Sequence, residues 1–405
     1  MSALHHWQKV RELARLGGEE TESDVLTAVA CTQAFALGWR IGASATAGAE
    51  LFEEGCAAAE RAGDLEALAM LNATYGTVRS QNQDITSDHL GYTGEAVRIA
   101  DRARNDALRC ATRAFLIFAH VAAGQLPEAE RVADELIDLA NEDPDLGAHL
   151  TGFSPLRAAH FFRLHCIAFI RDPAAALREF PLLCRDAVDG RCPEQAVWIL
   201  WFEAELKGAL GSAEGIRALA QAAVRLAEPL SIASEIVAAL ALCEALAGEH
   251  EWQTLLDTAE NALRLIRAQR AMQFILPIPL AHIGTAQLEL GNLNASRAAA
   301  EQGIAFMRSS ESAWSPHSYA VLARAQLALA EPAVDIAATL DEYAALLTRT
   351  GFHLYEGELH ELRARLAARE GHHAEQTAAL RRAHDCYTHF GMTAHLAGPQ
   401  RDFGL

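Results

Sequence analysis

The chain has 405 residues, of which 51% are hydrophobic and 7% aromatic, and it carries 53 acidic against 34 basic residues, a formal net charge of −19. Nucleic acids and anionic membranes bind basic surfaces, so this charge argues against both as partners. The acid-rich helix faces are alternatively explained by solubility alone. The only two lysines, Lys9 and Lys207, do not follow a glycine-rich turn, and the sequence therefore contains no phosphate-binding P-loop.

The sequence predicts helices from its first residues onward. Residues 6–16 place apolar side chains at helical spacing and stop at Gly17-Gly18, and Ser23 is positioned to begin a helix that reaches about Leu37. Strand-forming runs are nearly absent, which predicts an all-α protein. Beyond this point short turns interrupt small, aliphatic runs seven times at intervals of roughly 40 residues, near residues 124, 171, 211, 248, 291, 330 and 371.

A period of this size is typical of stacked helix hairpins, none of which can bury its apolar face alone. We therefore predict a right-handed α-solenoid, a single unit over residues 1–405 with about nine hairpins. Two stretches depart from the pattern. Gly and Pro punctuation predicts an irregular loop near residues 141–155, and Pro277 and Pro279 predict a helix that begins with proline in its first turn.

Several short motifs occur in a characteristic order along nearly the whole chain. They include Leu37-Gly38-Trp39-Arg40-Ile41-Gly42, Tyr75-Gly76-Thr77-Val78-Arg79, Gly152-Phe153-Ser154-Pro155 and Phe390-Gly391-Met392-Thr393-Ala394-His395. Together they resemble the tetratricopeptide-like region of bacterial proteins that carry a class III adenylate/guanylate cyclase domain and an AAA-type ATPase domain before it. The resemblance implies a tetratricopeptide-like array, either as a fragment of such a protein or as a stand-alone chain. The related maltose-regulator-type arrays bind inducers and partner proteins, so the resemblance also implies a binding function.

The densest aromatic cluster lies in the middle of the chain. Trp198, Trp201 and Phe202 stand at i, i+3 and i+4 and share one helix face. Arg157, His160 and Phe161 lie one repeat earlier. Aromatic and arginine side chains are common anchors at binding surfaces, so these residues are candidates for a partner-binding groove. The alternative is that they form the core between hairpins.

A second candidate element lies near the N-terminus. Trp39 and Arg40, with Tyr75 and Arg79, combine aromatic rings with guanidinium groups, which bind carboxylates in a bidentate manner. The alternative is a structural ion pair that braces the N-terminal hairpins.

Catalytic and metal-binding signatures are absent from the sequence. Ser44 and Ser154 lack the context of a nucleophile elbow, and His360-Glu361 is not followed by the second histidine of a zinc motif. The eight cysteines form no C-x-x-C pair. We therefore expect a non-enzyme without metal or cofactor, located in the cytoplasm, since neither a secretory signal nor a membrane-spanning segment is evident.

Three hypotheses for function follow. The first is a scaffold or regulatory module that binds a protein or peptide partner on its concave face. The second is a sensor of a small-molecule effector, which predicts a closed pocket near Phe161 and Trp198 in place of an open groove. The third is an enzyme of unfamiliar type, which predicts converging polar groups with perturbed pKa values in one cleft.

Overall fold

The computed structural model describes residues 3–14, 20–41, 45–81, 86–190 and 192–396. Within these ranges the chain forms α-helices and two 3₁₀ turns and contains no strand, so the all-α prediction is confirmed. In chain order the elements are α1 (Ala3–Ala14), α2 (Glu20–Ile41), α3 (Ala45–Ala62), α4 (Leu65–Gln81), α5 (Thr86–Ala103), α6 (Asp106–Ala122), α7 (Leu126–Ala140), α8 (Ala148–Thr151), α9 (Pro155–Ile170), α10 (Pro173–Asp189), α11 (Pro193–Ala209), α12 (Ile216–Ala227), α13 (Ile232–Gly248), α14 (Trp252–Gln269), η1 (Gln273–Ile275), α15 (Pro277–Glu289), α16 (Leu293–Ser310), α17 (His317–Ala328), α18 (Ala333–Thr350), η2 (His353–Tyr355), α19 (Glu356–Arg369) and α20 (His373–His389).

Two kinds of helix alternate along the array. Helices such as α14 bury a single stripe, residues 255, 256, 259, 262, 263 and 266, which is the pattern of a helix with one face in water. Helices such as α11 are buried on all sides, from Gln195 to Leu206. α11 belongs to an inner layer, α2, α4, α6, α9, α11, α13, α15, α17 and α19, in which each helix contacts the next inner helix. Its first and last members, α2 and α19, also carry exposed residues. The amphipathic helices cover this layer from outside.

The seven turns expected from the sequence each join an inner helix to the outer helix that follows it, from α6 and α7 to α19 and α20. Several of these turns need a left-handed residue, which glycine adopts without strain, as at Gly124, Gly211, Gly291 and Gly371. The helix after residue 276 begins at Pro277, as the proline pattern predicted. The segment between α7 and α9 contains a single helical turn, α8.

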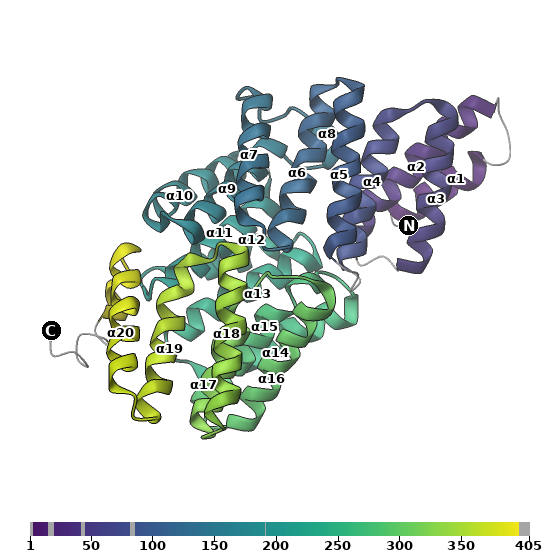
Figure 1. Ribbon diagram of the computed structural model, residues 1–405. Helices are drawn as coiled ribbons and strands as arrows, with labels where there is room; N and C mark the ends of the chain where they lie inside the picture. Colours follow the sequence, from purple (N-terminus) through teal and green to yellow (C-terminus); the bar gives the residue numbers. More distant parts are fainter. Residues whose placement is uncertain (1–2, 15–19, 42–44, 82–85, 191, 397–405) are drawn as a thin grey trace.

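The array is wound tightly enough for later repeats to touch earlier ones. Figure 1 shows the chain running from the N-terminal helices across to α10 and then turning back beneath them through α13 to α16. The contacts across this winding join α2 to α13, α4 to η1 and α9 to η2. The backbone N–H of Ala313 donates to the carbonyl of Ala122 at 3.2 Å, which ties the end of α6 to the turn before α17.

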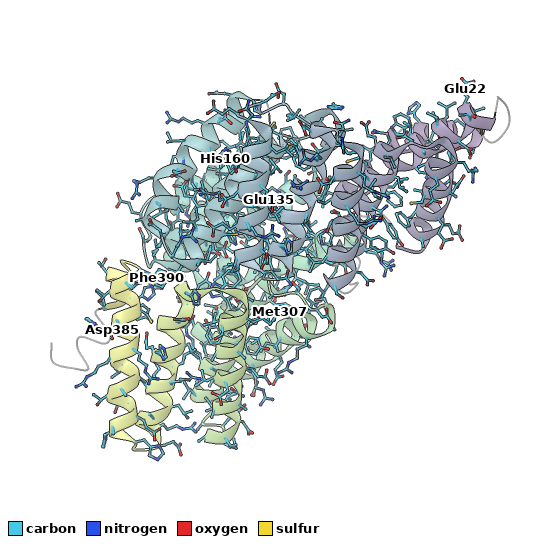
Figure 2. All side chains as sticks on the ribbon, turned by 45° about the horizontal axis from the view of Figure 1, so that its top comes forward. Glu22, Glu135, His160, Met307, Asp385 and Phe390 are labelled. Atoms are coloured by element: carbon cyan, nitrogen blue, oxygen red, sulfur yellow. The ribbon has the colours of Figure 1, made fainter. Side chains whose placement is uncertain are left out.

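The connections between later hairpins therefore fill the inner face of the earlier hairpins. One continuous hydrophobic core extends from Cys110 in α6 to Met392 beyond α20, whereas the N-terminal helices have separate, smaller cores around Tyr75 and Ile99. Figure 2 shows side chains of neighbouring helices projecting into the spaces between the ribbons. The inner face is consequently a packed surface with local pockets, and those pockets are where a ligand could enter.

Candidate ligand-binding site on the inner face

An apolar pocket of about 110 Å³ lies where the early inner helices meet the turn before α15. We call it the aromatic pocket. Its lining residues are Thr77, Ala114, Phe115, Phe118, Phe153, Ala158, Phe161, Phe162, Glu194, Gln195, Trp198, Met272 and Phe274. Five of the thirteen are phenylalanines of α6, α9 and their connection, and ligand pockets of proteins are commonly lined in this way by aromatic side chains with few polar groups.

Helical spacing explains how the early repeats supply their part of the wall. Ala114 and Phe118 are four residues apart on α6, and Ala158 and Phe162 are four residues apart on α9, so each pair projects from one helix face. The alanines leave the volume that a larger side chain would occupy. The pocket is thus a consequence of a small residue and an aromatic residue at matching positions of neighbouring inner helices.

The opposite wall comes from the turn that joins α14 to α15. Arg270 and Met272 both adopt left-handed backbone conformations, with φ of 50° and 58°. This conformation costs a residue other than glycine roughly 1–2 kcal/mol. The turn reverses the chain sharply and directs Met272 and Phe274 against α6, where the rings of Phe118 and Phe274 meet edge to face at 5.1 Å. Strain of this kind persists only where surrounding contacts stabilise it.

Trp314, in the turn before α17, completes the aromatic surroundings of the pocket. Its ring centroid lies 5.3 Å from that of Phe274, 5.9 Å from that of Phe118 and 6.4 Å from that of Trp198. Trp314 is 5% exposed, so it acts as a core residue that joins early and late repeats.

A second group of side chains runs along the inner layer beyond the pocket, and we call it the polar cluster. It consists of Glu205, Glu244, His282, His317, Arg324, Tyr355 and Glu358. Most of its members bond to one another. His282 Nε2 lies 3.3 Å from Glu244 Oε1, His317 Nε2 lies 3.1 Å from the Tyr355 hydroxyl, and Arg324 pairs with Glu358.

The pKa shifts in the polar cluster follow from these contacts. Burial raises the pKa of Glu244, but the neighbouring imidazoles of His282 and His317 outweigh it and the net shift is downward. Burial, and after it the charge of Glu244, raises the pKa of Glu205 well above its usual value. Glu205 Oε2 is buried and accepts no hydrogen bond within the described residues.

The residues that the sequence proposed as a groove do not form one continuous surface. Phe161 and Trp198 line the aromatic pocket, whereas Trp201 is fully buried behind it. Arg157 is buried, forms an ion pair with Asp186 and packs against Gly190. His160 is half-buried on α9, where burial lowers its pKa, and Figure 2 labels it there.

The N-terminal candidates lie in another part of the array. Arg79 pairs with Asp88 at 2.9 Å and lies over the ring of Tyr75, the arrangement of a structural ion pair between α4 and α5. The side chains of Trp39 and Arg40 lie outside the residues whose side chains the structure describes.

Sequence reasoning did not single out Phe118, Gln195, Phe274 or Trp314 as site residues. Phe274 stood in an irregular, proline-containing run, which was the one available signal. Trp314 lies in a serine-rich turn that carries no signal of its own. Their shared location depends on contacts between repeats that are far apart in the sequence.

Among the described residues, no group of three or more His, Cys, Asp or Glu side chains is arranged to hold a metal ion. In the same ranges, no helix combines the length and apolar character needed to cross a bilayer.

No protein-family model matches the chain, and no curated protein matches it in sequence. Solved structures do match its fold. The apo form of the quorum sensor NprR from B. thuringiensis is similar with a TM-score of 0.50 at 14% identity, over 87% of this chain and 96% of that one. The fold is therefore that of the tetratricopeptide-like helical-repeat solenoids.

Two further solved structures resemble the chain more distantly. One is a Signal Transduction ATPase with Numerous Domains from Pyrococcus horikoshii with a tetratricopeptide repeat sensor, at a TM-score of 0.44 and 16% identity over 86% of this chain. The chain spans 55% of the length of that protein. The other is a Rap protein complexed with Competence and Sporulation Factor, at a TM-score of 0.40 and 10% identity over 98% of both chains.

Proposed function

We propose that this protein is a non-catalytic regulatory module that binds a protein or peptide partner on its inner face, with an apolar side chain of the partner inserted in the aromatic pocket. The single observation that supports this function most directly is the composition of the pocket wall. One side comes from α6, α9 and α11 and the other from the turn at residues 270–276, so an occupant touches early and late repeats together.

Binding of such an occupant can regulate the protein by shifting its conformational population. A group that contacts both walls binds the tightly wound arrangement better than one in which the walls have separated, and binding shifts the population toward the wound form. A tenfold preference corresponds to about 1.4 kcal/mol. The similarity in fold to a protein described as a quorum sensor supports a regulatory role, as does the resemblance to the arrays of cyclase–ATPase proteins.

A free small-molecule effector is the second candidate. The apolar lining of the pocket favours it, because Phe161, Trp198 and Phe274 come from three separate elements and form a partly enclosed volume suited to one ring or one large side chain.

The test compares affinity capture from the source lysate by three forms of the full chain, read by quantitative mass spectrometry. Ala158→Leu fills the pocket, and Val334→Ser changes a side chain on α18 that is 72% exposed and remote from the pocket. We expect a partner that is recovered by the wild type and by Val334→Ser but depleted about tenfold by Ala158→Leu. A partner retained equally by Ala158→Leu contradicts binding at the pocket, and a retained small molecule in native mass spectra supports the second candidate.

A further inference from the structure

Gln195 is the polar side chain that distinguishes the aromatic pocket from an ordinary core void. It is 6% exposed and forms part of the pocket wall, near the start of α11. Its amide nitrogen donates to the backbone carbonyl of Ser154 at 3.0 Å. Because a carbonyl oxygen only accepts hydrogen bonds, this contact determines which end of the amide faces Ser154.

The acceptor of that contact is itself held in place. The Ser154 hydroxyl donates to the carbonyl of Pro144 at 2.5 Å and accepts from the backbone N–H of Arg157 at 3.3 Å, which makes Ser154 the N-cap of α9. Gln195 therefore cannot exchange its two amide ends without losing a hydrogen bond to this cap.

The oxygen of Gln195 is the end of the amide that does not face Ser154. Gln195 Oε1 is buried and accepts no hydrogen bond from the described residues. Gln273 Oε1 is likewise buried without a donor among the described residues, but Gln273 is not one of the residues that line the pocket. Buried polar atoms in folded proteins are nearly always paired, so the unpaired oxygen of Gln195 in the wall of the pocket points to a donor that the described residues do not supply.

The other lining residues indicate the size and the charge of the occupant. The pocket volume of about 110 Å³ is smaller than the cavity of about 150 Å³ that encloses a benzene ring, but the pocket is partly open, so one edge of a ring can lie outside it. The lining holds one carboxylate, Glu194, and no cationic side chain, which disfavours an anionic occupant.

We infer that the aromatic pocket recognises a neutral or cationic aromatic ring that carries a hydrogen-bond donor, with the oxygen of Gln195 as the acceptor. The inference rests on the proposed function and specifies the class of group that enters the pocket. An indole-type N–H meets both requirements, whether the ring belongs to a side chain of a partner or to a free molecule.

The experiment uses three probes of nearly the same shape on the full chain, measured by calorimetry or by ligand-observed NMR. Indole has the N–H donor, benzofuran has an oxygen acceptor in its place, and indene has neither. Each probe is titrated into the wild type, Gln195→Met and the pocket-filling Ala158→Leu. Thermal unfolding of each variant identifies any that does not fold, and the order of the probes on the wild type is informative without the variants.

We expect indole to bind the wild type about tenfold more tightly than benzofuran or indene, since a site built around an unpaired acceptor rejects analogues without the donor. The preference should disappear in Gln195→Met, and all three probes should weaken in Ala158→Leu. Equal binding of the three probes to the wild type, lost in Ala158→Leu, overturns donor recognition and leaves the proposed function standing. Binding of no probe, or binding unchanged in Ala158→Leu, overturns the inference, while capture of a partner by the pocket is decided separately by the lysate experiment.

Discussion

The aromatic pocket and the polar cluster occupy neighbouring parts of the same inner layer, and α11 contributes Trp198 to one and Glu205 to the other. In the polar cluster most groups find partners on the next inner helix, as Glu244 does with His282 and Arg324 with Glu358. In the aromatic pocket the walls surround unfilled volume, and the oxygen of Gln195 accepts no hydrogen bond from the part of the chain that the structure describes.

This difference indicates different roles. A polar network whose members satisfy one another stabilises one arrangement of helices and needs nothing from outside. An apolar pocket with an unpaired acceptor is incomplete until a ligand enters it. Glu205 is the exception within the polar cluster, because its Oε2 accepts no hydrogen bond within the described residues. Variants in both regions can therefore test the comparison.

The largest effect is expected from removing the aromatic contact between early and late repeats. Trp314→Ala deletes a buried ring that touches Phe118, Phe274 and Trp198, and large-to-small changes of this kind cost about 3–5 kcal/mol. Trp252→Ala, at a half-buried ring on the outer helix α14, is the matched control and should cost clearly less. Urea unfolding measures both, and equal losses would show that Trp314 does not join the two parts of the array.

Substitutions at two glycines test the same contact between early and late repeats without changing a pocket-lining residue. Gly124 has φ +69°, and a Cβ there would lie 2.5 Å from Ala313 and 2.6 Å from Thr350. Gly291 has φ +83° with nothing within 4 Å. Both alanine variants carry the backbone strain of roughly 1–2 kcal/mol, but Gly124→Ala adds overpacking of about 1–3 kcal/mol against the late repeats. Unfolding free energies that drop equally in the two variants would contradict a tight contact at residue 124.

His165 in α9 and Glu205 in the polar cluster should contribute to the pH dependence of stability with opposite signs, and His165 gives the larger contribution. Burial lowers the pKa of His165, which packs on Phe202, to about 3. Between pH 6.5 and 3 the unfolded chain binds a proton that the folded chain does not, so stability falls as the pH falls. The contribution at pH 5 is about 2 kcal/mol.

His165→Phe should therefore reduce the loss of unfolding free energy between pH 7.5 and pH 5 by about 2 kcal/mol. Burial also lowers the pKa of His89 to about 3, so part of the wild-type loss will remain in this variant. Chemical unfolding at both pH values measures the difference, with the exposed His373→Gln as control. An unchanged pH dependence in His165→Phe would rule out this histidine as a source.

Glu205 gives the smallest effect. Because burial raises the pKa of Glu205, the folded chain keeps a proton that the unfolded chain loses above about pH 4.5, and stability falls as the pH rises toward the folded-state pKa. Glu205→Gln should raise the unfolding free energy by about 1 kcal/mol at pH 8 and leave it unchanged at pH 4. The exposed Glu260→Gln is the control, and a destabilised Glu205→Gln at pH 8 would mean that the carboxylate is needed ionised.

Much of the fold could be predicted from the chain because its information is local. The recurring turns, the capping residues and the absence of strand patterns led to helix hairpins, and the proline pattern led to a helix with proline in its first turn, which the structure begins at Pro277. For the candidate site, the spacing of Phe161 and Trp198 led to residues that line the pocket. The same reasoning grouped them with Arg157 and Trp201, which the structure places in an ion pair and in the core.

The sequence alone determined which helices form and which neighbours pair, since each hairpin must cover the apolar face of the next. It did not determine how far the array winds. Small rotations between repeats accumulate over many hairpins, and only their sum brings Phe274 and Trp314 against Phe118. The pocket forms only because these rotations bring distant repeats together, and no local sequence pattern connects the repeats that form its walls.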